Sequence, residues 1–136
     1  MAVEMTGKYV GNLKTEITHG PSGTVIRTAA PADNNGDGSS FSPTDLVAAS
    51  LGACMVTVMA ILAARHDWDL TGTHWRVEKH MNAEPRRIGR LPLEIHLPAA
   101  LEPRARGALE RAAHTCPVHR SLDHDIEMPI VFVYDV

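Results

Sequence analysis

The longest apolar stretch of the chain runs from Leu46 to Ala64, interrupted only by a serine, a glycine and a threonine. It follows the tetrapeptide Ser-Pro-Thr-Asp at 42–45. That tetrapeptide favours a helix start, because a hydroxyl or carboxylate caps free amide groups and proline suits the first turn. A helix that is apolar on nearly every side must be enclosed on nearly every side. The pattern therefore predicts a helix over residues 42–65 at the centre of the core.

Three short segments before this helix have the composition of β-strands, at residues 5–11, 13–20 and 23–30. Glycines at their ends separate them as tight turns do, so we expect a three-stranded β-meander. Residues 31–40 are rich in Asp, Asn, Gly and Ser, which predicts a surface loop. The loop resembles the start of a calcium-binding loop, but it lacks the later glutamate at the required spacing.

Polar and apolar residues alternate after the helix, over residues 69–81 and again over 91–97. In the second segment Leu91, Leu93, Ile95 and Leu97 share one face. The segment 82–91 between them is polar and predicts the turn of a β-hairpin. Its three arginines, at 86, 87 and 90, are expected at the hairpin tip in solvent.

A second helix is expected over residues 101–116, with an apolar face made of Ala105, Leu109, Ala112 and Cys116. Pro117 disfavours helical geometry at the residue before it and suits the first turn of a new helix, which predicts a short helix over 117–125. The apolar segment 126–136 predicts a last strand. This order of elements indicates the α+β class, with a single domain over residues 1–136.

Composition narrows the classes of function. The chain has 136 residues, a net charge of −3 and 4% aromatic residues, which gives no basis for binding nucleic acid or an anionic membrane surface. The apolar run approaches the ~20 residues of a membrane span. Its many alanines, its glycine and its strand-like flanks favour a soluble core helix instead. The N-terminal residues show no signal-peptide pattern, so we expect a cytoplasmic protein.

Two cysteines, Cys54 and Cys116, carry the candidate chemistry. In a reducing compartment a cysteine pair is more often catalytic, redox-active or metal-binding than a structural disulfide. Ser50, Cys54 and Thr57 are spaced to share the one helix face with any polarity, where they would line a small pocket. Cys116 comes just before a predicted helix N-terminus, where amide groups and the helix dipole lower the pKa of a thiol.

Three interpretations of this pair stay open. In thiol redox chemistry, peroxide oxidises one thiolate to sulfenic acid and the second cysteine closes a disulfide, which requires Cα atoms within ~7 Å. In a metal site, His114, Cys116 and His119 would supply ligands together with Cys54, although their spacing matches no standard zinc motif. In the third interpretation both cysteines are small buried residues of a binding or structural protein.

The segments SPTDLVAASLGACM at 42–55 and CPVHRSL at 116–122 resemble the OsmC/Ohr family, which comprises osmotically inducible protein C and organic hydroperoxide resistance proteins. The resemblance covers the whole chain, including the order of its elements. It implies an OsmC-like α+β fold: an N-terminal β-meander, a long central cysteine helix, a β-hairpin, a second helix and a C-terminal strand. It also implies an intertwined homodimer with the cysteine helices packed centrally, which would explain why the helix has almost no polar face.

The same resemblance implies that the protein reduces organic hydroperoxides with no metal and no other cofactor. Cys54 then corresponds to the peroxidatic cysteine and Cys116 to the resolving cysteine. A dithiol reductant, either lipoyl-type or a low-molecular-weight thiol, would regenerate the pair.

The sequence departs from the family pattern at the groups that activate the thiol. The well-characterised peroxidases carry Asn-Pro-Glu at the start of the cysteine helix, and this glutamate pairs with an arginine from the N-terminal strands. Here Thr44 stands in place of the glutamate, and Asp45 beside it is rotated by ~100° around the helix. The corresponding N-terminal turn, residues 19–23, contains no arginine. The chain therefore resembles a less characterised branch of the family.

Two functions follow from this departure. In the first, the protein is a cysteine peroxidase for organic hydroperoxides in oxidative stress defence, with Cys54 ionised by another cation such as Arg27 or Arg120 of either subunit. In the second, it is a dimeric binding protein for a small hydrophobic or thiol-reactive ligand, with weak or no peroxidase activity. His119 and Ser50 are further candidates for the pocket around the thiols. A cation beside a solvent-open Cys54 favours the first function.

Overall fold

The computed structural model describes all residues from 1 to 136. The chain divides into two compact units, Met1–Leu46 and Val47–Val136. The boundary between them falls inside the first turns of the long helix. That the whole chain acts as one domain stays a prediction.

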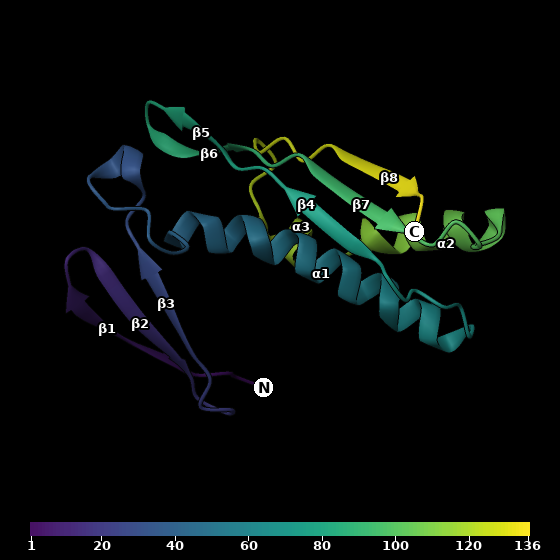
Figure 1. The fold of residues 1–136 in the computed structure, drawn as a ribbon, viewed down its shortest axis with the longest axis horizontal. Helices are drawn as coiled ribbons and strands as arrows, with labels where there is room; N and C mark the ends of the chain where they lie inside the picture. Colours follow the sequence, from purple (N-terminus) through teal and green to yellow (C-terminus); the bar gives the residue numbers. More distant parts are fainter. The chain divides into compact units, whose positions relative to one another are not determined.

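The N-terminal unit contains an antiparallel sheet of three strands in the order β1 (Met5–Gly11), β2 (Lys14–His19) and β3 (Val25–Ala29) (Figure 1). This is the predicted β-meander. The loop that follows includes a single 3-10 turn, η1 (Ala32–Asn34). Asp37 holds this loop, because its carboxylate accepts the N–H of Ser39 at 3.0 Å and pairs with Lys14 at 3.0 Å. Asp37 thus stabilises the conformation of the loop in which it lies.

The cysteine helix, α1 (Pro43–Arg65), begins where the sequence predicts. The Ser42 hydroxyl accepts the Asp45 N–H at 3.1 Å, and the Asp45 carboxylate accepts the Ser42 N–H at 2.8 Å. This reciprocal arrangement is a capping box, and an N-cap hydroxyl of this kind contributes about 0.5–2 kcal/mol. Pro43 occupies the first helical position, where its missing N–H would have had no helical partner.

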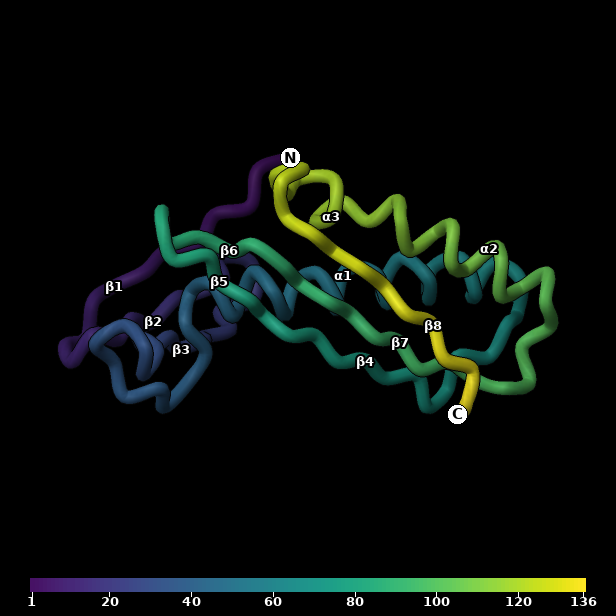
Figure 2. Tube along the Cα trace, turned by 90° about the horizontal axis from the view of Figure 1, so that it is seen from above, coloured from purple at the N-terminus to yellow at the C-terminus, as the bar shows by residue number.

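The C-terminal unit contains a second sheet, in the order β4 (His74–Val77), β7 (Leu93–Leu97) and β8 (Ile130–Tyr134). β4 and β7 are antiparallel, whereas β7 and β8 are parallel. Figure 2 shows these three strands running side by side. Between β4 and β7 the chain forms a separate two-stranded hairpin of β5 (His80–Ala83) and β6 (Arg86–Arg90).

This hairpin corrects one prediction, because residues 82–91 are not a polar turn. Only Glu84 and Pro85 lie between the two paired strands. The arginines belong to β6, and two of them form ion pairs: Arg87 with Asp125 at 3.8 Å and Arg90 with Glu127 at 3.5 Å. Arg86 and Arg90 are exposed as predicted, and the acidic partners of Arg87 and Arg90 come from a segment far along the chain.

Two helices connect β7 to β8, α2 (Pro103–Ala113) and α3 (Pro117–Ser121). Each starts with a proline, as predicted. Both end earlier than predicted, at Ala113 and Ser121, because the residues after Ala113 form a turn and Leu122 adopts an extended conformation. The buried face of α2 includes Ala113, which lies one helical turn after Leu109. Ala112, which was predicted for this face, is only half-buried.

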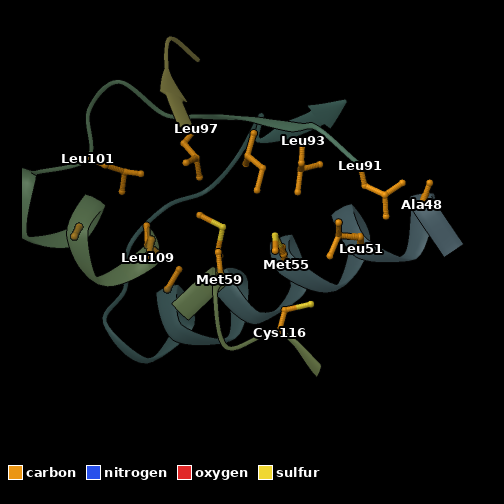
Figure 3. Packing of buried hydrophobic residues seen from close by; sticks show 14 of the residues in the cluster. Ala48, Leu51, Met55, Met59, Leu91, Leu93, Leu97, Leu101, Leu109 and Cys116 are labelled. Carbon is orange, nitrogen blue, oxygen red and sulfur yellow. The ribbon is translucent and has the colours of Figure 1, made fainter. Parts of the chain in front are cut away.

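The core of the C-terminal unit lies between α1 and the second sheet. Figure 3 shows side chains from the helix and from the strands pointing toward one another. The face of Leu91, Leu93, Ile95 and Leu97 is buried as predicted. The residues that α1 contributes are almost completely buried as well: Leu51, Met55, Met59 and Ala63.

The opposite face of α1 is exposed within a single chain, at Ala53, Thr57, Ala60, Ile61 and Ala64. The expectation that this helix is enclosed on nearly every side is therefore not met by one chain alone. By length and composition α1 would also be able to cross a membrane. This is weak evidence, because core helices of soluble proteins pass the same test.

Gly52 allows the close approach of α1 to the sheet. A Cβ atom at this position would lie 2.3 to 2.7 Å from three ring atoms of Trp75 on β4. Real Cβ atoms essentially never make such contacts, so any larger residue would push the helix and the sheet apart. Glycine is present in this helix because the indole ring packs directly on the helix backbone.

We predict that Gly52→Ala destabilises the protein by roughly 1–3 kcal/mol, because the new methyl group overpacks the core against Trp75. Gly107→Ala on α2 is the matched control, since its nearest neighbour is the flexible end of Arg111 at 3.3 Å. There the better helix propensity of alanine should stabilise by about 0.5–1 kcal/mol. Urea unfolding followed by circular dichroism measures both. Equal effects of the two substitutions would contradict the proposed contact.

Candidate active site

The structure brings Cys54 and Cys116 together, although they are far apart in the sequence. Both are free thiols. Cys54 is half-buried on α1, and Cys116 is completely buried immediately before α3. The two thiols lie close enough for Cys54 to raise the pKa of Cys116. Two adjacent thiols with unequal access to solvent are thus the central feature of the site.

A proline break places Cys116. α2 ends in a turn in which the Cys116 N–H donates to the Ala113 carbonyl at 3.2 Å. Cys116 leaves the helical conformation, with φ of −53° and ψ of 128°, as expected for a residue that precedes a proline. It then caps α3, because its Sγ atom accepts the His119 N–H at 3.4 Å. The same residue therefore ends one helix and begins the next.

The electrostatic setting of Cys116 corrects the sequence-based prediction of a lowered pKa. Burial raises the pKa of the Cys116 thiol, and the adjacent Cys54 raises it further. The hydrogen bond from the His119 N–H acts in the opposite direction but is outweighed. The prediction was wrong because desolvation, which the sequence did not show, exceeds the effect of one helix N-terminus. Cys116 therefore keeps its proton at neutral pH.

Ser50 and Thr57 lie on the same helix face as Cys54, but their hydroxyls are used within the helix. Ser50 donates to the Val47 carbonyl at 2.7 Å, and Thr57 donates to the Ala53 carbonyl at 2.7 Å. Such bonds to the preceding turn are common for hydroxyl residues in helices. Ser50 is half-buried and Thr57 exposed, so this face leads from the thiol pair outward to solvent.

Thr44 and Asp45 have local roles at the start of α1. The Thr44 hydroxyl lies 3.2 Å from that of Ser42, and Asp45 completes the capping box. Ten residues separate Thr44 from Cys54, which corresponds to ~15 Å along a helix axis. Neither residue of this helix start can therefore contact the Cys54 of its own chain.

Arg27 lies on β3 of the N-terminal unit, where it is exposed and pairs with Glu16 at 2.9 Å. Both residues line a hollow of about 520 Å³ in that unit. The Arg27 guanidinium therefore already has a carboxylate partner, whereas an arginine that activates a thiol pairs with the thiolate. The role of Arg27 at Cys54 stays a prediction.

His119 and Arg120 lie on α3, one turn after Cys116. His119 is half-buried, and burial lowers its pKa, helped by the charges of His114 and His124. His114 and His119 cross at 89° with ring centroids 6.2 Å apart, and no group of three or more possible ligands in the structure is placed to hold a metal ion. His124, which the sequence analysis did not single out, lies near both because the chain turns back after α3.

The family model for OsmC-like protein matches residues 36–130 of this chain. No protein among the curated sequences matches it. Among solved structures, a Psychrobacter arcticus protein described as an osmotic stress induced and detoxification response protein is 38% identical, with a TM-score of 0.90 over 94% of this chain and 93% of its own.

More distant structures share the fold. The organic hydroperoxide resistance protein OsmC from Legionella pneumophila is 18% identical, with a TM-score of 0.78 over 98% of this chain and 97% of its own. The organic hydroperoxide resistance protein OhrB of Bacillus subtilis is also 18% identical, with a TM-score of 0.66 over 97% of this chain and 98% of its own. The fold, the order of the elements and the family match agree, and the chain belongs to the OsmC-like protein family.

Proposed function

We propose that this protein is a cytoplasmic thiol peroxidase that reduces organic hydroperoxides and so contributes to defence against oxidative stress. The observation that carries the proposal is the contact between the half-buried Cys54 and the buried Cys116. A related protein that carries the name organic hydroperoxide resistance protein supports the choice of substrate class. Family membership by itself supports a role in the response to peroxide stress.

The proposed cycle transfers two electrons. The Cys54 thiolate attacks the outer oxygen of R–O–O–H, the O–O bond breaks, and the leaving alkoxide takes up a proton to give the alcohol. Cys54 is then a sulfenic acid. The Cys116 sulfur attacks this sulfenic sulfur, its proton leaves with the hydroxide as water, and a disulfide forms. A lipoyl-type or low-molecular-weight dithiol would reduce the disulfide and return both thiols.

The two environments assign the two roles. Within a single chain Cys54 is partly exposed, as a thiol that meets peroxide must be, whereas Cys116 is completely buried. Burial and the adjacent Cys54 raise the pKa of Cys116, which keeps a proton on this sulfur. When the sulfenic acid forms, that same proton is available to the departing hydroxide. The geometry thus supports Cys54 as peroxidatic and Cys116 as resolving.

Dimerisation is the second part of the proposal. On the exposed face of α1, Ala53, Thr57, Ala60 and Ala64 recur at intervals of four, three and four residues. This spacing is typical of a seam between two packed helices. Ile61 adds an exposed apolar side chain beside it. We infer that α1 of a second copy covers this face, which gives the homodimer that the family resemblance implies.

A dimer would also bear on the missing activator of Cys54. The start of α1 cannot reach the Cys54 of the same chain, whereas a partner subunit is not limited by the helix length. Thr44 and Asp45 of the second subunit, and Arg27 or Arg120 of either subunit, are thus the candidates to contact the thiol. Thr44 in place of a glutamate favours the alternative function, a dimeric protein that binds a small hydrophobic or thiol-reactive ligand and has little peroxidase activity.

The assignment of roles predicts the order in which the thiols react. Iodoacetamide at pH 8 should modify Cys54 at least roughly tenfold faster than Cys116, because the thiolate reacts and Cys116 is buried and protonated. Mass spectrometry of tryptic peptides measures each site. In urea the two rates should become similar, which controls for local sequence. Faster modification of Cys116 in the native protein would reverse the assignment.

The peroxidase function predicts the stoichiometry of oxidation. One equivalent of cumene hydroperoxide should consume two thiols, and hydrogen peroxide should act more slowly. Cys54→Ser should leave Cys116 reduced. Cys116→Ser should instead accumulate a sulfenic acid on Cys54, which dimedone traps for mass spectrometry. Oxidation no faster than that of a free thiol would refute the peroxidase and leave the binding protein, to be tested by ligand screening.

The dimer proposal predicts a specific response to charge on α1. Ile61→Asp should dissociate the dimer, because a carboxylate would be buried in the helix seam without a partner. Sedimentation velocity measures the mass. Val131→Asp on β8 is the matched control, since Val131 is 56% exposed and Ile61 is 52% exposed. A monomeric native protein, or equal dissociation by both variants, would contradict the proposed seam.

A further inference from the structure

A second hollow lies next to the thiol pair, in the C-terminal unit. Its volume of about 480 Å³ is within the range of small-molecule sites. Six residues line it: His114, His119, Arg120, His124, Ile126 and Met128. His119 joins this hollow to Cys116, because it lines the hollow and its backbone N–H donates to the thiol.

Arg120 brings a permanent positive charge to the polar wall of the hollow, while Asp123, Asp125 and Glu127 alternate with lining residues along the neighbouring segment. None of its lining residues is acidic. The ion pairs nearby join Arg87 to Asp125 and Arg90 to Glu127, and they leave Arg120 out. Burial lowers the pKa of His119, and the charges of His114 and His124 lower it further. A bound anion would offset positive charge in this wall.

The rest of the lining is apolar. Ile126 and Met128 are half-buried and pack against the hydrophobic core. A methionine side chain is flexible and adapts to ligands of different shapes. The hollow thus combines a cationic wall with an apolar floor. The imidazoles do not converge as metal ligands do, since the rings of His114 and His119 cross nearly at right angles.

We propose that this hollow binds a small amphipathic organic acid. Arg120 and the histidines hold the carboxylate, and the hydrocarbon chain lies on Ile126 and Met128. An arginine is suited to this role because its planar group donates two parallel hydrogen bonds to a carboxylate. Binding strengthens as the pH falls, because protonation of the His119 imidazole beside Arg120 adds positive charge to the wall. The site does not depend on peroxidase activity of the thiols.

Octanoate is the probe, and the experiment uses the full chain with ¹³C-labelled histidine rings and methionine methyl groups. Octanamide has the same hydrocarbon chain without the charge, and sulfate has the charge without the chain. Heteronuclear NMR titrations at pH 6 and pH 8 follow His114, His119, His124 and Met128. Arg120→Gln removes the proposed anchor, and Arg104→Gln removes an equally exposed arginine on α2.

We expect octanoate to bind roughly tenfold or more tightly than octanamide, with shifts at both the histidines and Met128. Octanoate should raise the pKa of His119, and it should bind more tightly at pH 6 than at pH 8. Arg120→Gln should lose most of the affinity, and Arg104→Gln should keep it. Equal binding of octanamide, equal binding of sulfate, or unchanged affinity in Arg120→Gln with its native spectrum retained would overturn the proposal.

Discussion

The packing of α1 on the sheet of β4, β7 and β8 is the contact on which the other features of the C-terminal unit depend. Leu51, Met55 and Met59 are completely buried in it. Burial of each such side chain is worth about 1.5–3 kcal/mol. Gly52 sets how closely the helix approaches, because the ring of Trp75 occupies the space of a Cβ atom. Cys54 lies between the buried and exposed sides of the same helix, so this packing determines how far its thiol is open to solvent.

The proline break after α2 decides the character of the second thiol. It turns the chain so that Cys116 faces Cys54 from outside α1, and it exposes the N–H of His119 to the sulfur. Because the surrounding core also removes water from Cys116, the proton stays on this thiol. The proline break thus sets the position of Cys116, and burial in the core sets its protonation. The resolving role proposed for Cys116 requires this position, and in the attack its proton passes to the departing hydroxide.

The segment around Cys116 borders two different environments. On one side the sulfur contacts Cys54 in an apolar setting, and on the other side His114, His119 and Arg120 line a cationic hollow. The charged wall lies close to the buried thiol but forms no ion pair with it. The separation allows binding of an anion and thiol chemistry to be tested by different substitutions. Arg120 reports on the hollow, and the cysteines report on the redox pair.

The sequence by itself determined the features that rest on local interactions. The start of α1 follows from four consecutive residues, the three N-terminal strands from their turns, and the break at Cys116 from one proline. The buried leucine face of β7 follows from the period of two residues along a strand. The family resemblance identified the fold because the two cysteine motifs and the order of elements are all visible in the chain.

The tertiary structure decided everything that depends on contacts between distant residues. Arg87 and Arg90 of β6 pair with Asp125 and Glu127, which lie far along the chain. The pKa of Cys116 rises because burial, which no local pattern reports, exceeds the effect of one helix N-terminus. No sequence pattern predicts the close contact between Gly52 and the ring of Trp75. The hollow beside Cys116 likewise exists because the chain after α3 returns His124, Ile126 and Met128 to the end of α2.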